Sequence, residues 1–193
     1  MKKIDAFILY SQPEQAATTV AELKQSKSIH KIFLLTPPDV KETIKGCKNI
    51  EIDSLYSCET VRKIARKCTS DFALLYQKST ALRPGYFALE RMVQIAEDMK
   101  GGMIYSDYYT TDSEKKNHPV IDYQEGSLRD DFDFGSLVLY RTKALKDAAR
   151  KMRAEKYLFA GLYSLRLKIS QQHLPVHINE YLYTEVEEDT RLS

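Results

Sequence analysis

The sequence predicts one α/β domain with a mostly parallel central sheet and helices on both faces. Short apolar runs alternate with amphipathic segments of helical length from the N-terminus to about residue 105. Several of these runs are apolar at successive positions, which is typical of strands that are covered on both faces. A length of 193 residues, of which 43% are hydrophobic, suits a single core.

Capping residues and prolines mark the expected helix starts of the first half. Ser11 and Glu14 have the spacing of a capping box, and Pro13 suits the first turn of a helix. Ser57 is expected to cap a basic amphipathic helix, and Pro84 to open the next helix. The strands expected in this half are residues 6–10, 32–35, 50–52, 72–76 and a run that begins at residue 103.

The pattern loosens after about residue 110. A strand is expected over residues 136–140, then a helix capped by Thr142, a helix near residues 158–169 and a last strand over residues 176–178. No internal repeat or low-complexity linker divides the chain, so residues 1–193 are interpreted as a single domain. The polar C-terminal stretch favours the N-terminal part of a longer protein.

Charge and cysteine content exclude several classes of function. The 29 basic and 27 acidic residues leave a formal charge of +2, which argues against nucleic acid or an anionic membrane as the main partner. Cys47, Cys58 and Cys68 lack the spacing of metal ligands, and the pair His173 and His177 has no third ligand nearby. No run approaches the roughly 20 apolar residues of a membrane helix. These features predict a cytoplasmic protein without a transmembrane segment.

Ligands of open α/β sheets bind beyond the carboxyl ends of the strands. The chain has no G-x-G-x-x-G after the first strand and no G-x-x-x-x-G-K-[ST], so a Rossmann dinucleotide site and a P-loop are both disfavoured. Polar residues nevertheless follow the expected strands. These are Ser11 to Glu14, Thr36 to Asp39, Asp53 and Ser54, Gln77 to Thr80, and Ser106 and Asp107.

Six short segments spread over nearly the whole chain have a common order. They are ILYSQPE at 8–14, SDFALLY at 70–76, LRPGY at 82–86, IYSDY at 104–108, LRL at 165–167 and HINEYLY at 177–183. In this order and spacing the chain resembles the family 2 inverting glycosyltransferases of the GT-A fold, most closely those of Bacteroides-type bacteria. The resemblance implies a domain that takes a nucleotide sugar.

The resemblance also implies a nucleotide site at the end of the first strand. The residues of this site would face the base, the ribose or the diphosphate of the nucleotide. Four of these residues have a simpler alternative: Glu14 suits a helix cap, Asp39 and Asp53 suit turns, and Arg62 suits a solvated helix face. The implied nucleotide contacts are Ser11, Gln12, Pro13, Glu14, Asp39, Asp53, Arg62, Gln77, Lys78 and Ser79.

The acidic D-x-D motif of the family holds Mn²⁺ or Mg²⁺ against the diphosphate. Counted back from Pro84, its position falls on Gln77, Lys78 and Ser79, which include no acid. The metal would therefore lack its usual carboxylates here. Lys78 is a candidate to neutralise phosphate charge directly, as a metal-independent enzyme requires, and a solvated lysine is the alternative.

The Glu-Asp pair that supplies the family's catalytic base is also missing, because its position falls on Phe159 and Ala160. Asp107, at a strand end, is the first substitute, with a structural cap as the alternative. Asp131 and Asp133 belong to an acidic cluster that would line the acceptor cleft or chelate a metal. The alternative for this cluster is an exposed turn that leads into buried aromatic side chains.

The sequence therefore predicts an inverting glycosyltransferase that moves a sugar from a nucleotide sugar to the hydroxyl of a glycan or another acceptor. The missing acids favour an alternative, a catalytically silent domain of this fold that binds a nucleotide, a glycan or another protein domain, including a downstream domain of the same chain. A nucleotidyltransferase is a third possibility, but no Gly-rich basic loop follows the first strand.

Overall fold

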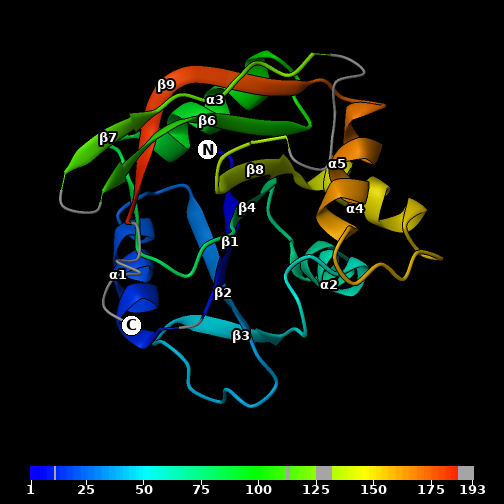
Figure 1. Ribbon diagram of the computed structural model, residues 1–193, viewed down its shortest axis with the longest axis horizontal. Helices are drawn as coiled ribbons and strands as arrows, with labels where there is room; N and C mark the ends of the chain where they lie inside the picture. The colour runs from blue at the N-terminus through cyan, green and yellow to red at the C-terminus, as the bar shows by residue number, and fades with distance from the viewer. Residues whose placement is uncertain (11, 112–113, 125–131, 187–193) are drawn as a thin grey trace.

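The computed structural model describes residues 1–10, 12–111, 114–124 and 132–186. Within these residues nine strands form one sheet, in the order β3-β2-β1-β4-β8-β6-β9-β5, with β7 paired to β6 (Figure 1). The strands are β1 (Ile4–Leu9), β2 (Ile29–Thr36), β3 (Cys47–Glu51), β4 (Phe72–Tyr76), β5 (Leu82–Pro84), β6 (Met103–Thr111), β7 (Lys115–His118), β8 (Leu137–Arg141) and β9 (Pro175–Val186). The helices are α1 (Pro13–Leu23), α2 (Cys58–Lys67), α3 (Ala88–Asp98), α4 (Thr142–Lys151) and α5 (Gly161–Ser170).

The first half of the chain forms the parallel part of the sheet. β1 pairs in parallel with β2 on one side and β4 on the other, and β3 joins β2 in parallel. All five side chains of β4 are buried, as its continuous apolar run predicts. The α/β class and the expected strand over residues 72–76 are therefore confirmed.

The second half of the chain makes the sheet mixed. β8 runs antiparallel to both β4 and β6, whereas β6 and β9 pair in parallel. Because β8 lies between β4 and β6 and is antiparallel to both, β6 runs in the same direction as β4. The last strand is longer than expected: β9 spans Pro175–Val186, whereas the sequence pattern predicts a strand over residues 176–178 only.

Pro84 was expected to open a helix, and this expectation was wrong. It is the last residue of β5, an edge strand where a missing N–H donor is tolerated. The chain then turns, with the N–H of Gly85 bonded to the carbonyl of Leu182 at 2.8 Å, and α3 starts at Ala88. Phe87, in the N-cap position, adopts a left-handed φ of 53°.

Helix starts differ from the expectation at two other places. The N-cap of α1 is Gln12, which forms no side-chain cap, so the expected cap one residue earlier is wrong in position; Ser11 itself lies outside the described residues. Thr142 is the first residue of α4 and not its cap. The expected cap of α2 is confirmed, because Ser57 Oγ accepts a hydrogen bond from the N–H of Thr60 at 3.1 Å.

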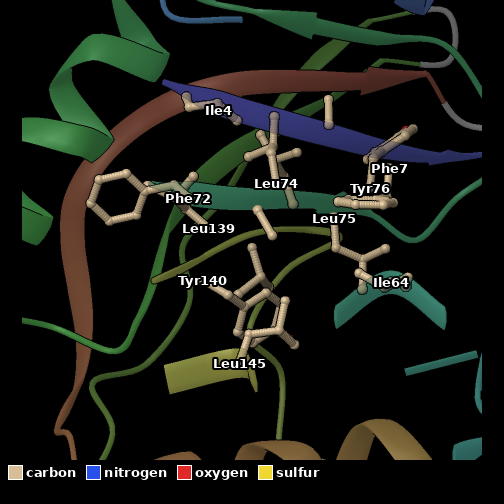
Figure 2. Packing of buried hydrophobic residues seen from close by; sticks show 14 of the residues in the cluster. Ile4, Phe7, Ile64, Phe72, Leu74, Leu75, Tyr76, Leu139, Tyr140 and Leu145 are labelled. Carbon is tan, nitrogen blue, oxygen red and sulfur yellow. The ribbon is translucent and has the colours of Figure 1, made fainter. Parts of the chain in front are cut away.

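The helices cover both faces of the sheet. α2, α4 and α5 lie together on one side, and α1 lies on the other (Figure 1). Figure 2 shows the core on the first side, where Ile64 of α2 and Leu145 of α4 pack onto β4 and β8 beside Leu75 and Tyr140. Because β1, β2, β3 and β4 are parallel, their carboxyl ends lie at one edge of the sheet, called here the carboxyl edge.

Candidate functional site

The residues expected to contact a nucleotide lie around the carboxyl edge. Gln12, Pro13 and Glu14 start α1 directly after β1, and all three are exposed. Asp39 follows β2 and Asp53 follows β3, and both are exposed too. The fold thus brings these segments to one edge of the sheet, and their contacts with a ligand stay predictions.

Gln77, directly after β4, has a side chain held in one orientation by Arg166. Its Oε1 accepts a hydrogen bond from Arg166 Nη2 at 3.0 Å. Since a guanidinium has no acceptor atom, this contact assigns the amide oxygen to the arginine side. The Gln77 Nε2 atom then points elsewhere, and it is buried without a hydrogen-bond partner among the described residues. Buried donors without a partner are rare in native proteins, so this one requires an explanation.

Arg166 itself comes from α5, far along the chain. Its Nε approaches the hydroxyl of Tyr140 at 3.5 Å, and its guanidinium lies 5.0 Å from the ring centre of Phe134. No carboxylate of the described residues forms an ion pair with it. The arginine therefore brings to Gln77 a positive charge that no described carboxylate pairs with.

Lys78 forms an ion pair with Glu185 of β9. The Glu185 side chain is 1% exposed, whereas that of Lys78 is 45% exposed, so the ammonium group lies at the boundary with solvent. The second carboxylate oxygen of Glu185 accepts a hydrogen bond from Ser136 Oγ. Sequence reasoning missed Glu185; its only sequence signal is its place in the apolar-polar alternation near the end of β9.

Tyr183 supports this network from β9. Its hydroxyl accepts hydrogen bonds from the backbone N–H of Ser136 at 3.0 Å and of Leu137 at 3.3 Å. Burial raises the pKa of Tyr183, which therefore stays a neutral phenol in the physiological range. The network thus rests on a rigid part of the sheet.

The turn after β4 and its partner Glu185 do not fit a divalent cation. Gln77, Lys78 and Ser79 include no carboxylate, and both oxygens of Glu185 are already bonded to Lys78 and Ser136. Across the described residues no group of three or more His, Cys, Asp or Glu side chains is placed to hold a metal ion. Mn²⁺ and Mg²⁺ prefer several carboxylate or carbonyl oxygens, which this set does not offer.

A second polar cluster joins Asp107 of β6, His177 of β9 and Asp122. His177 Nε2 lies 2.8 Å from Asp107 Oδ1, and its Nδ1 lies 2.5 Å from Asp122 Oδ1. Ionised carboxylates only accept hydrogen bonds, so both bonds form when the imidazole ring carries both protons. The histidine and Asp107 side chains are 5% and 10% exposed, but Asp122 is 72% exposed.

Aromatic and backbone contacts fix the His177 cluster in place. Tyr105 stacks on His177 with ring centres 5.0 Å apart, and its hydroxyl donates to the carbonyl of Ile121 at 2.9 Å. Burial raises the pKa of Tyr105. Asp107 Oδ1 also accepts the N–H of Val120 at 2.9 Å. The expected candidate Asp107 is thus a buried partner of His177, which the sequence analysis had considered only as a metal ligand.

Of the acidic cluster, Asp133 lies within the described residues. Asp133 Oδ1 accepts the N–H of Gly135 at 2.7 Å, and Oδ2 lies 3.2 Å from His118 Nε2. Phe134 is buried and packs edge-on to Tyr105 with ring centres 4.9 Å apart. These contacts agree with the alternative of an exposed turn that leads into aromatic anchors. Asp131 lies outside the described residues.

Arg62 of α2 bonds to backbone carbonyls. Its Nη1 donates to Met152 O at 3.0 Å and to Glu155 O at 2.9 Å. These bonds tie α2 to the segment that follows α4. The nucleotide contact expected for Arg62 stays a prediction, with a structural role now beside it.

The segment before α5 contains Phe159 and Ala160 at the place of the missing base. The Phe159 side chain points outward, with the residue 80% exposed. Its backbone is clamped to the start of α2 on both sides, because Gly161 N donates to Tyr56 O at 2.7 Å and Cys58 N donates to Tyr157 O at 2.9 Å. This segment offers no acid of its own to a ligand.

Comparison with known proteins identifies the fold. No family model and no curated protein sequence matches the chain. Among solved structures, S. aureus TarS 1–349 superposes with a TM-score of 0.68 at 9% identity, over 95% of this chain and 60% of that one. The same TarS fragment is also known in complex with UDP-GlcNAc.

Two further structures extend this comparison. Mannosyltransferase PcManGT from Pyrobaculum calidifontis, in complex with GDP-Man and Mn²⁺, has a TM-score of 0.61 at 10% identity and covers 96% of this chain and 56% of that one. The 4-diphosphocytidyl-2C-methyl-D-erythritol synthase from Anaerococcus prevotii has a TM-score of 0.61 at 10% identity, over 93% of this chain and 90% of that one.

The fold is therefore that of the GT-A-like nucleotide-sugar transferases. At these identities the likeness shows the fold alone. The chain spans less than two thirds of the two glycosyltransferase chains. Within the described residues, no helix has the length and apolar character that a membrane crossing requires.

Proposed function

We propose that this chain is a glycosyltransferase-like domain that binds a nucleotide sugar at the carboxyl edge without a metal ion. The observation that carries the proposal is the buried Nε2 donor of Gln77, which has no partner among the described residues and lies at the place of the D-x-D motif. The neighbouring cations are Lys78 and Arg166, and within the described residues Lys78 alone of the two has a carboxylate partner. A diphosphate group has only acceptor atoms and negative charge, so it complements this set of donors.

The proposal extends to sugar transfer. The hydroxyl oxygen of the acceptor forms a bond to the anomeric carbon as the bond from that carbon to the diphosphate oxygen breaks, and the nucleoside diphosphate leaves. The hydroxyl proton passes to Asp122, the exposed end of the cluster with His177 and Asp107. Asp107 positions the histidine from its buried side.

Binding without transfer is the second candidate, and the exposed Phe159 favours it. In that case the carboxyl edge retains a nucleotide or a glycan, and the chain acts as a recognition domain. Release of free nucleotide from a donor sugar, measured with and without candidate hydroxyl acceptors, separates the two candidates.

Calorimetric titration tests the donor site. UDP-, GDP- and CMP-sugars are titrated into the protein with Mn²⁺ and with a chelator, and we expect one of them to bind with equal affinity in both conditions. Lys78→Gln should weaken that binding by about tenfold, since one charge-assisted contact with phosphate contributes about 1.4 kcal/mol. The matched control Lys67→Gln, in the last turn of α2, should leave it unchanged.

Two results would contradict the proposal. Binding that requires Mn²⁺ would show that metal ligands exist which this site does not provide. Binding of none of the three classes of nucleotide sugar would remove the transferase interpretation of this chain. For the transfer step, Asp122→Asn should lower the turnover number without changing donor affinity, and an unchanged turnover number would exclude Asp122 as the proton acceptor.

A further inference from the structure

Residues of α2 and α4, with Arg153 just after α4, line an open hollow of about 380 Å³. This volume lies within the range of small-molecule pockets, roughly 300–1,000 Å³. Five of the seven lining residues are cations: Arg62 and Arg66 of α2, Lys146 and Arg150 of α4, and Arg153 just after α4. The other two are alanines, and no described acid lines the cavity. These seven residues are called the basic groove.

Helix stabilisation explains only part of this charge. Cations in the last turn of a helix interact favourably with the helix dipole, which accounts for Arg66 and Arg150. The same reasoning accounts for Lys67 and Lys151, which lie in the same last turns but do not line the cavity. Lys146 lies in the middle of α4, so the dipole gives no reason for its charge.

The arrangement brings like charges close together. Arg62 and Arg66 are four residues apart on α2, as are Lys146 and Arg150 on α4, and each like-charged pair at this spacing destabilises a helix by about 0.2–0.5 kcal/mol. The small alanine side chains let the two helices present these charges around one hollow. An anion in the groove would relieve the repulsion.

Part of the positive charge in the groove is unpaired. Arg150 forms an ion pair with Asp147 at 2.8 Å, and Arg62 bonds to two backbone carbonyls. For Arg66, Lys146 and Arg153, the described part of the chain supplies no hydrogen bond or ion pair. Three cations are thus available to a ligand.

We propose that the basic groove binds a phosphate-rich anion, such as a diphosphate group. Guanidinium groups bind phosphate oxygens in pairs, and the lysine adds a compact charge between them. A free phosphate compound and a lipid headgroup share this chemistry. The inference does not depend on the donor site: Arg62 is the one groove residue that was also expected to contact the nucleotide, and the test below changes Arg66 and Lys146 instead.

Calorimetry with inorganic pyrophosphate tests the proposal. The double variant Arg66→Gln with Lys146→Gln should bind pyrophosphate at least about tenfold more weakly than the parent chain. The control is Lys67→Gln with Lys151→Gln, which removes the same charge from the same two helices outside the groove; its affinity should stay within about twofold. Circular dichroism melts verify that both variants fold.

Two further experiments show where the anion binds and which kind of compound supplies it. Lys78→Gln should retain pyrophosphate binding; if it abolishes binding and the groove variant does not, the anion binds at the carboxyl edge and the groove proposal fails. Flotation with phosphatidylcholine vesicles, with and without phosphatidic acid, tests whether a lipid headgroup supplies the phosphate that the groove binds. Loss of pyrophosphate binding or of phosphatidic acid-dependent flotation in the groove variant alone supports the proposal and identifies the source. Equal behaviour of both double variants in both assays overturns it.

Discussion

The turn after β4 and the segment before α5 are the two places where the resemblance to family 2 glycosyltransferases led us to expect acids, yet their surroundings differ. Around the turn, Gln77 and Lys78 are bonded to side chains from α5 and β9. In the segment, Phe159 points into solvent, and the contacts that hold its neighbours are made by backbone atoms. The turn after β4 thus belongs to a polar side-chain network, whereas the segment before α5 is held by backbone hydrogen bonds.

This difference separates two chemical tasks. Diphosphate binding needs donors and positive charge, and residues from several elements provide them at the turn. Proton transfer needs an ionisable group at a defined place, and the segment before α5 has none to offer. Its nearby acid, Glu155, is bonded to Lys168 and Ser164. We therefore expect donor binding to be more robust in this chain than sugar transfer.

The largest effect should come from Gly161→Ala. A Cβ at this residue would lie 2.5 Å from the backbone of Ser57 and Cys58, so the start of α5 would separate from α2. We expect a loss of about 3 kcal/mol in the free energy of unfolding, measured by urea denaturation. Gly85→Ala is the graded control, because its Cβ would lie 3.2 Å from Leu182 O, and it should cost less than half as much.

Lys78→Gln should have the next largest effect on stability. It leaves the buried carboxylate of Glu185 with Ser136 as its remaining partner, which should cost about 2 kcal/mol at neutral pH. In a double-mutant cycle, Glu185→Gln in the Lys78→Gln background should cost at least about 1 kcal/mol less than in the parent chain. Additive losses would show that the network is not a coupled unit.

Glu155→Gln tests the segment before α5, because its effect on the free energy of unfolding should depend on pH. Burial raises the pKa of Glu155, but bonds from Lys168 and Ser164 and the charge of Arg62 outweigh it, so the pKa lies below the ordinary 4.5. The ionised carboxylate therefore stabilises the fold above pH 4.5, and this stabilisation is lost as the pH falls through the lowered value. The variant should lose about 1 kcal/mol at pH 7 and match the parent in acid; a constant difference would contradict this assignment.

Phe159→Glu should have the smallest effect. Because the side chain is 80% exposed, the change in the free energy of unfolding should stay below about 0.5 kcal/mol. The variant places an acid where the resemblance to family 2 glycosyltransferases implies one, and donor affinity in calorimetry should not change. A gain in nucleotide release would show that this position reaches the acceptor.

Local patterns predicted much of the first half of the chain. The apolar run at residues 72–76 became β4, and Ser57 caps α2, because both features depend on neighbouring residues alone. β7 was missed, since Lys115–His118 has no apolar alternation. It is held instead by pairing with β6 and by Lys115 over the ring of Tyr109, 3.6 Å from its centre. Such a strand is visible only with its partner.

The sequence likewise predicts one part of the candidate site and not the other. The absence of acids at residues 77–79 and at Phe159 can be read directly from the chain. The partners that replace them cannot: Glu185 is 107 positions from Lys78, and His177 is 70 positions from Asp107. Which residues meet over such separations depends on strand order and register, which β8 and β9 set only when the sheet assembles.

Apolar periodicity, which acts over a few residues, was thus sufficient for the α/β class and the parallel arrangement of the first four strands, and the absence of acids at residues 77–79 and 159–160 can be read from the sequence. The Gln77 Nε2 atom without a partner among the described residues, the Lys78–Glu185 pair and the His177 cluster were decided by tertiary structure. The physical reason is that hydrogen bonds and ion pairs act over a few ångströms in space. Only the folded sheet brings residues so distant in sequence within that range.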